Sequence, residues 1–255
     1  MHDTSFENLD LFAKTYLSYF NNLKVVDVGS RLRTQEKKVK WRKILEEHDY
    51  IGVDLVDGDN VDLVLEDPYI YPFESNSIDV IIANSIFEHS EFFWELFIEL
   101  IRILKPSGLL YINAPSNGDF HRGPFNQDLL VDVYRFYPDS GKALQKWGNK
   151  NGYKDLILLE SYIFNRRDKN WNDFVAVFIK DKNKLSLYKN RILKQTKHFY
   201  NGYIYGLEGI LNYQTLTEDH KLLFKKQYIK KVKKNIKLLI KKLKSALKKI
   251  VNLFK

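Results

Sequence analysis

The chain of 255 residues contains no cysteine, which excludes disulfide bonds, thiolate metal sites and cysteine nucleophiles. It also lacks any run of the roughly 20 apolar residues that a membrane-spanning helix needs, and no apolar signal segment stands at its start. We therefore expect a cytoplasmic protein. Its length is sufficient for one hydrophobic core with an appendage.

Acidic residues are missing from the last part of the sequence. Residues 1–220 hold 27 lysines and arginines against 32 acidic residues, a net charge of −5, whereas residues 221–255 hold 14 lysines and no acid, a net charge of +14. The overall charge of +9 therefore comes entirely from this tail. Its apolar residues recur at steps of three and four, which predicts an amphipathic helix with a lysine-covered opposite face. They are Ile229, Val232, Ile236, Leu239, Leu243, Leu247, Ile250 and Phe254.

Such a helix suits several partners. We favour peripheral attachment to the inner face of an anionic membrane, where each lysine near the surface contributes about 1 kcal/mol. Pairing with another helix or packing on its own domain is the next alternative. Nucleic acid is not an expected partner, because residues 1–220 are net negative and the tail contains no arginine. Residues 181–220 are expected to be a mainly helical linker, serving as a homo-oligomer contact or as a cap over the site.

Glycine is sparse, and one glycine follows a buried strand. The run from Lys24 to Val28 is apolar and β-branched, and Gly29 ends it with a turn that lets a ligand approach the backbone closely. A helix is expected over residues 35–47. A second strand over residues 50–54 ends in Asp54, about 25 residues after the glycine, the separation at which a βαβ unit brings an acid to the ribose hydroxyls of a nucleoside. Asp54 is therefore the predicted ribose ligand.

Further strands end in polar residues. A strand over residues 61–65 precedes Asp67, and a strand over residues 78–83 precedes Asn84 and His89. In open α/β sheets, ligands bind outside the carboxyl ends of the strands. Helices are expected over residues 6–20, 91–104 and 140–149, and strands over 109–113, 156–162 and 172–179. Between these elements lie a loop with His121 and Arg122, and the run from Asp132 to Phe136.

These motifs resemble the class I S-adenosylmethionine-dependent methyltransferases, above all in the acid at 67, Pro72-Phe73 and Glu88-His89. The resemblance implies a Rossmann-like seven-stranded sheet with an antiparallel last strand over residues 1–180, with S-adenosylmethionine as cofactor. It also implies roles for particular residues: the methionyl end of the cofactor meets Asp27 and Gly29, the ribose meets Asp54, and the adenine meets Asp67. Ser30, Leu55 and Asn84 complete the expected cofactor set.

Two features of the chain depart from that family. Its members usually carry two or three glycines in the first loop, where this chain has Ser30, Arg31 and Arg33, and Pro68 lacks the backbone N–H that usually meets the adenine. A nicotinamide-binding unit is the alternative for this segment, but it requires Gly-x-Gly-x-x-Gly, and the chain supplies one glycine of the three.

The acceptor decides which side chains the reaction needs. Methyl transfer is an in-line displacement, so an alcohol acceptor must lie about 3 Å from the methyl carbon and lose its proton to a base. His121 or His89 is the candidate base, with Asp132 orienting it. An anionic acceptor needs no base, and Arg31, Arg122 and Arg135, together with Tyr134, would position it. No metal is expected.

The loop residues and the basic tail are similar to those of enzymes from bacterial surface-polysaccharide loci. This resemblance implies O-methylation of a small polar acceptor in capsule biosynthesis, either a sugar hydroxyl or a phosphoramidate or phosphate group. The alternative from another class is a catalytically degenerate cofactor-binding scaffold for membrane-associated glycan enzymes, which the missing loop glycines favour.

Overall fold

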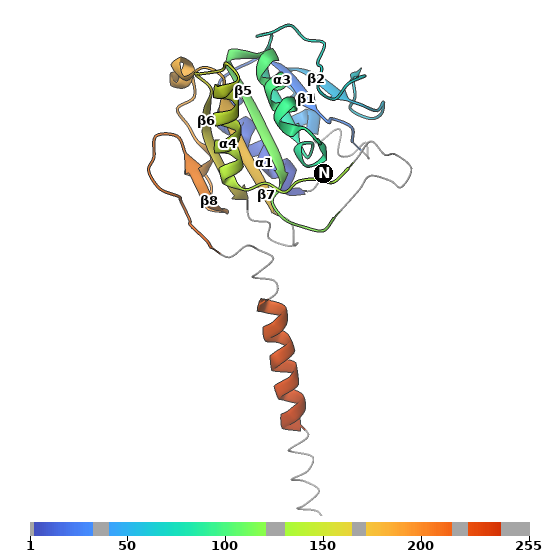
Figure 1. Cartoon of the computed structure of the whole chain (residues 1–255), viewed down its shortest axis with the longest axis vertical. Coiled ribbons are helices and arrows are strands. Elements are labelled where there is room, and N and C mark those ends of the chain that lie inside the picture. Colours follow the sequence, from blue (N-terminus) through green and yellow to red (C-terminus); the bar gives the residue numbers. More distant parts are fainter. Residues whose placement is uncertain (1–2, 33–40, 121–130, 165–171, 216–223, 241–255) are drawn as a thin grey trace, which may run out of the picture. The chain divides into compact units, whose positions relative to one another are not determined.

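The computed structural model describes residues 3–32, 41–120, 131–164, 172–215 and 224–240 (Figure 1). Residues 1–214 form one compact unit and residues 215–255 a second. The first unit contains the sheet and all predicted site residues that are described. His121, Arg122 and Arg33 lie outside the described residues.

The first unit is built on an eight-stranded sheet with the strand order β3-β2-β1-β4-β5-β7-β6-β8. The first five strands pair in parallel, and β7 runs antiparallel to both β5 and β6. This arrangement confirms the predicted Rossmann-like sheet with an antiparallel strand near its end, and one strand is added to the expected seven. The strands are β1 Lys24–Val28, β2 Asp49–Asp54, β3 Leu63–Val64, β4 Ile78–Asn84, β5 Leu104–Pro115, β6 Ile157–Phe164, β7 Asp173–Ile179 and β8 Phe199–Ile204.

Helices cover both faces of this sheet. In Figure 1, α3 and α4 lie on one face and α1 lies behind the other. Residues 41–44 are also helical and belong to the helix expected over 35–47, whose residues 35–40 lie outside the described part. The remaining helices are α1 Asp3–Phe12, which continues as the π-helix Ala13–Leu17, the 3₁₀ helix Phe87–His89, α3 Phe93–Ile103, α4 Pro138–Lys150, and the 3₁₀ helices Lys182–Leu187 and Ile192–Lys194.

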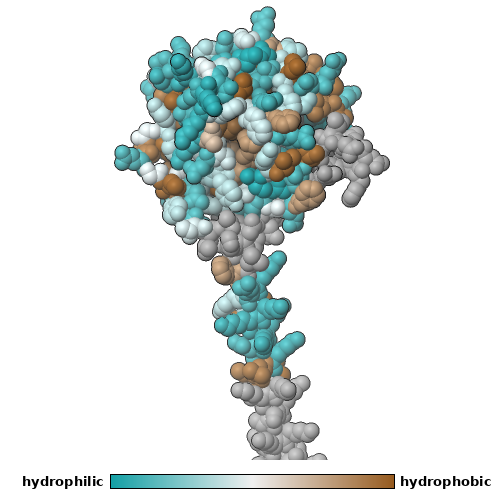
Figure 2. Space-filling view, in the orientation of Figure 1, coloured by the Kyte–Doolittle hydropathy of each residue, from teal (hydrophilic) through white to brown (hydrophobic). Residues whose placement is uncertain are grey.

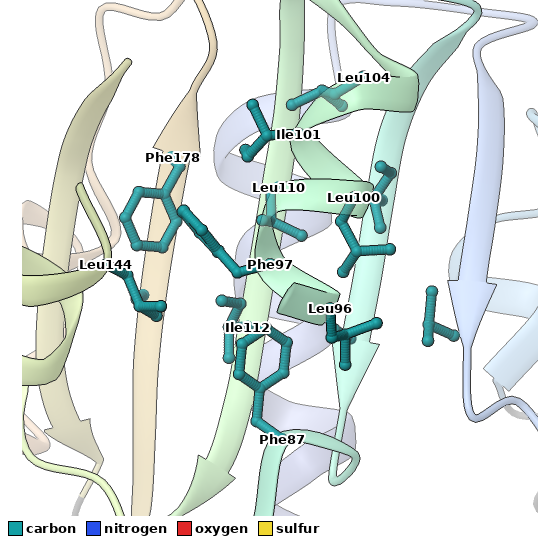
Figure 3. Close-up of a cluster of buried hydrophobic side chains, with 14 of the residues drawn as sticks. Phe87, Leu96, Phe97, Leu100, Ile101, Leu104, Leu110, Ile112, Leu144 and Phe178 are labelled. Atoms are coloured by element: carbon teal, nitrogen blue, oxygen red, sulfur yellow. The ribbon is translucent and has the colours of Figure 1, made fainter. Parts of the chain in front are cut away.

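The core on the α3 side is formed by apolar side chains at helical spacing. Leu96, Phe97 and Leu100 of α3 are at most 2% exposed and face β5 (Figure 3). The ring of Phe97 meets that of Phe178 on β7 edge-on, with centroids 5.1 Å apart. Burial of each such side chain contributes about 1.5–3 kcal/mol, so this stripe fixes α3 across the centre of the sheet.

The opposite face is closed by the N-terminal helical segment. The ring of Phe12 lies 4.7 Å from that of Tyr111 on β5. The hydroxyl of Tyr16 donates to Oε1 of Glu160 on β6 at 2.5 Å, and the same carboxylate accepts from the backbone N–H groups of Ile192 and Leu193. One buried carboxylate thus ties the N-terminal segment and a downstream segment to the sheet.

Residues 181–214 differ from the expected helical linker. They contain two short 3₁₀ helices and then β8, which pairs antiparallel with β6 and so extends the sheet. Phe199, Tyr200 and Ile204 of β8 are buried. Aromatic and β-branched side chains favour strands when a sheet edge is available, and β6 supplies that edge. The segment therefore belongs to the first unit.

The second unit contains a helix over residues 224–240. No side chain of this helix is buried, and its visible face in Figure 2 is mainly hydrophilic with hydrophobic atoms toward the two ends. Ile229, Val232, Ile236 and Leu239 of the predicted apolar stripe lie on it, whereas Leu243, Leu247, Ile250 and Phe254 fall outside the described residues. Within the described ranges, none of the helices combines the length and hydrophobicity needed to cross a membrane.

Candidate active site

The turn after β1 is built for close approach of a ligand. Gly29 has a φ of 71°, a left-handed conformation that side chains disfavour, and an added Cβ would lie 3.0 Å from Cδ1 of Ile86. The N–H groups of Gly29 and Ser30 both donate to the carbonyl of Val53 on β2, at 2.9 and 3.1 Å. The buried Ser30 hydroxyl donates to the carbonyl of Asn60. The turn is therefore rigid, and its glycine is required.

Asp54 ends β2 beside this turn. Its two carboxylate oxygens accept from the backbone N–H groups of Arg31 at 3.1 Å and Val56 at 3.2 Å. A carboxylate has about four acceptor positions, so each oxygen keeps a lone pair for a further donor. The side chain is half-buried, as is that of Leu55. Asp54 is thus oriented, accessible and able to accept two ribose hydroxyls, which fits an adenosyl cofactor.

Asp27 is held inside the fold next to the same turn. Its Oδ2 accepts from the indole of Trp41 and from the hydroxyl of Tyr50, both at 2.6 Å. Burial raises the pKa of the Asp27 carboxyl to about 7, against these two hydrogen bonds, which lower it. The carboxyl joins β1, β2 and the helix at residue 41, so it shapes the turn. Its contact with the cofactor stays a prediction.

The other predicted cofactor residues lie at the ends of the next strands. Asp67 is exposed, and its Oδ1 accepts from the N–H of Tyr69 at 2.7 Å, which fixes the turn around Pro68. Asn84 ends β4 and is buried. Ser85 then reverses the chain with a φ of 56°. Asp67 thus lies near β3 and Asn84 near β4, on opposite sides of the Gly29 turn.

Arg31 takes part in this region through its backbone. Its N–H binds Asp54, while its exposed side chain lies so close to Gly58 that an added Cβ there would be 2.7 Å from Nε. The guanidinium therefore lies over the loop between β2 and β3. Its predicted role in binding the acceptor remains untested.

The segment after β4 contains a buried acid that sequence reasoning missed. Glu88 is 1% exposed, and burial raises the pKa of its carboxyl to about 8, partly offset by the charge of Arg135. Its backbone carbonyl accepts from the N–H groups of Val133 and Tyr134 at 2.8 and 3.3 Å. Its Oε2 has no hydrogen-bond partner within the described part of the chain. The sequence signal for Glu88 is its place next to His89, the residue predicted as a base.

His89 is fixed by the same contact between segments. Its Nδ1 lies 2.5 Å from the carbonyl oxygen of Val131, so we assign the hydrogen to Nδ1. Its Nε2 lies 3.8 Å from Oε1 of Glu88. The ring is held in place with the nitrogen that can accept a proton directed toward Glu88. His89 stays a predicted base.

Asp132 and Arg135 are partners of one another. The guanidinium binds both carboxylate oxygens, at 2.5 and 2.8 Å, and also donates to the carbonyls of Tyr134 and Asp119. Asp132 is the main cause that raises the pKa of Arg135. The ring of Tyr134 packs edge-on against Phe93 at 4.8 Å. The cluster fastens residues 131–136 to the carboxyl edge of the sheet, so acceptor contacts by Arg135 and Tyr134 are proposals still to be tested.

Taken together, the carboxyl edge has two neighbouring parts. The turn at Gly29 with Asp54 lies at β1 and β2, and suits a nucleoside. The second part lies at β4, where an acceptor would meet the reactive end of the cofactor. It consists of Asn84, which ends β4, and of Glu88 and His89, which follow it. No group of three or more histidines and acids suited to a metal occurs among the residues that the structure describes.

Known proteins similar to this chain are methyltransferases. Residues 11–112 match the family model of a methyltransferase domain. Malonyl-[acyl-carrier protein] O-methyltransferase 1 of Coxiella burnetii is 30% identical over 139 residues, which cover 54% of this chain and 46% of that protein. The chain thus spans about half the length of this curated relative.

A solved structure supports the fold. The 1,6-didemethyltoxoflavin-N1-methyltransferase of Burkholderia thailandensis, solved with S-adenosylhomocysteine, superposes with a TM-score of 0.52 at 15% identity, over 70% of this chain and 79% of that one. This likeness confirms the predicted fold class. The match of residues 11–112 agrees with the expectation of a methyltransferase domain.

Proposed function

We propose that the chain is an S-adenosylmethionine-dependent O-methyltransferase that acts on a small polar acceptor. The observation that carries this proposal is the pairing of the Gly29 turn with the oriented carboxylate of Asp54, at the ends of adjacent parallel strands. This pair lies within the residues that match the methyltransferase family. The departures at Ser30 and Pro68 do not close the turn, because Ser30 points to Asn60 and Pro68 follows the exposed Asp67.

When bound, the cofactor supplies a methyl group made electrophilic by a positively charged sulfur. The chain's residues have to bind the acceptor in line with this methyl group and remove a proton. A hydroxyl acceptor would have to pass its proton to one of the chain's own side chains. His89 is the described candidate, because its ring is held beside Glu88 just after the carboxyl end of β4 and imidazole titrates near neutral pH.

Two classes of acceptor fit this proposal. One is a neutral hydroxyl, as in a capsule sugar, and the other is an anionic oxygen of a phosphoramidate or phosphate in surface-polysaccharide synthesis. Oxygen as the accepting atom is supported by the name of the Coxiella burnetii relative, an O-methyltransferase. The polysaccharide context rests on the similarity of the loop residues and the lysine-rich tail to enzymes of such loci.

The test is turnover on an acceptor panel. Purified chain is incubated with S-adenosylmethionine and with simple sugars, sugar phosphates or phosphoramidate, and release of S-adenosylhomocysteine is measured. We expect release with one acceptor class, and loss of it in Asp54→Ala. Cofactor binding without turnover on any acceptor of the panel would favour the scaffold alternative.

A further inference from the structure

Three buried asparagine side chains near the carboxyl edge of the sheet have polar atoms that are poorly satisfied among the described residues. No hydrogen bond of good geometry reaches either polar atom of the Asn8 and Asn113 side chains or the side-chain oxygen of Asn84, although the hydroxyl of Tyr111 lies close to Asn113. All three residues are at most 2% exposed. A buried polar group left without a partner costs about 1–3 kcal/mol. A cost of this size at several neighbouring positions points to a ligand that supplies the missing hydrogen bonds.

Two of the asparagines are neighbours on one face of the sheet. Asn84 of β4 and Asn113 of β5 are paired in register, as are Ile82 and Tyr111 two positions earlier. Ile82 and Tyr111 belong to the core cluster that packs against α1. Because side chains alternate along a strand, Asn84 and Asn113 lie on this same face, one step nearer the carboxyl edge.

The N-terminal helical segment runs along the sheet in a direction that places its first turns over Asn84 and Asn113. Phe12 lies against Tyr111, and Phe20 lies against Tyr188, with ring centroids 5.8 Å apart. The hydroxyl of Tyr188 donates to the carbonyl of Ser107, near the start of β5. The segment therefore runs from the carboxyl edge toward the amino edge, and residues before Phe12 lie nearer the carboxyl edge.

Asn8 lies one helical turn before Phe12 and on the same side of α1. It is therefore placed over the row formed by Asn84 and Asn113. The hydroxyl groups of Thr4 and Ser5, one turn earlier still, are buried and also unpaired among the described residues. The first turns of α1 and the ends of β4 and β5 thus bring together a cluster of uncharged groups that donate and accept hydrogen bonds.

The charged groups described near this cluster include Asp173 and Arg135. Asp173 at the start of β7 acts with burial to raise the pKa values of Tyr111 and Tyr162, so a carboxylate lies close by. The guanidinium of Arg135 is engaged by both oxygens of Asp132. A carboxamide both donates and accepts hydrogen bonds, and so does a hydroxyl group, so the two match.

We propose that Asn8, Asn84 and Asn113 form the acceptor subsite, and that the acceptor is a neutral molecule rich in hydroxyl groups, of the sugar class. The inference rests on the proposed methyltransferase function and chooses between its two acceptor classes. The subsite lies on β4 and β5, next to the turn at β1 that meets the cofactor, so a bound hydroxyl lies at the reactive end of the cofactor.

Stability provides a test that needs no known substrate. Asn113→Leu removes unpaired polar atoms and keeps the side-chain size, so we expect the melting temperature of the free protein to rise by about 2–4 °C. The matched control is Asn117→Leu, because the buried Asn117 accepts from the N–H of Asn172 at 2.7 Å, and its loss should lower the melting temperature.

Binding provides the second test. The whole chain, saturated with S-adenosylhomocysteine, is examined by saturation-transfer NMR with methyl glucoside and methyl galactoside as neutral probes, and with glucose 1-phosphate and phosphoramidate as anionic probes. We expect signals from a neutral probe, weakened about tenfold in affinity by Asn113→Leu and unchanged by Tyr19→Phe, a change at an exposed surface position.

Two results overturn the inference: a fall in melting temperature in Asn113→Leu, or binding of the anionic probes in preference to both glycosides. Absence of binding by any neutral probe also counts against it. Failure of the proposed function looks different: S-adenosylhomocysteine would then not bind to the wild-type chain, or it would bind but no acceptor of the panel would be methylated.

Discussion

Gly29 adopts a φ of 71° where the chain leaves β1, and two separate physical effects make glycine necessary there. A side chain would be strained by about 1–2 kcal/mol in this conformation and would press on Ile86. Gly29→Ala should therefore lower both the free energy of unfolding and the affinity for S-adenosylhomocysteine. Gly206→Ala is the control, because Gly206 has a φ of 81° but nothing within 4 Å of an added Cβ. Equal effects of the two changes on cofactor affinity would contradict the role of Gly29.

Glu88 gives the protein a predictable dependence on pH. Its pKa is raised from 4.5 to about 8 in the folded state, so the folded protein holds a proton that the unfolded chain releases between these values. The contribution of Glu88 to stability is fully present below about pH 4.5 and is lost as the pH rises toward 8. Glu88→Gln should remove this dependence.

The measurement is urea unfolding of wild type and Glu88→Gln at pH 5 and pH 8. At pH 8 the variant should exceed the wild type in stability by more than about 1.4 kcal/mol, the value of one pKa unit. At pH 5 the difference should be smaller. A constant difference at both values would show that the carboxyl of Glu88 does not hold its proton in the folded state.

A buried hydrogen bond from the hydroxyl of Tyr16 to Glu160 adds to the apolar packing that holds the N-terminal helical segment on the sheet. Tyr16→Phe removes that donor while two backbone N–H groups still bind the carboxylate. Hydrogen bonds to charged groups contribute about 1.5–3 kcal/mol, so we expect a loss of this size and faster hydrogen exchange over residues 3–17. Tyr19→Phe, at a position 78% exposed, should change neither quantity. Unchanged exchange in Tyr16→Phe would mean that apolar packing alone holds the segment.

Local patterns predicted the elements that hold the nucleoside end of the site. The sequence predicts β1 with Gly29 and β2 with Asp54. The apolar run of a strand, the residue that ends it and the separation of Gly29 from Asp54 are all local properties of the sequence. β8 could not be read in this way, because residues 199–204 become a strand only through the free edge of β6. The burial of Glu88 depends on residues 131–135, far along the chain, and the unpaired Asn8 depends on how α1 lies on the sheet.

The two parts of the sequence on either side of residue 220 differ in charge, and we expect them to have different functions. Residues 1–220 carry −5 and residues 221–255 carry +14, and the described tail helix over 224–240 has both lysines and apolar residues on its surface. We propose that this tail binds anionic membranes. Removal of residues 221–255 should abolish co-sedimentation with vesicles containing phosphatidylglycerol and leave methyl transfer in solution unchanged. Neutral phosphatidylcholine vesicles are the control, and retained binding by the truncated chain would contradict the proposal.

Cofactor binding at Asp54 is the claim on which the whole account depends. The most direct measurement is calorimetric titration of S-adenosylhomocysteine into the wild-type chain and into Asp54→Ala. The account predicts micromolar binding by the wild type and its loss in the variant, because no other described residue at this turn offers an oriented carboxylate to the ribose. Absence of binding by the wild-type chain would contradict it.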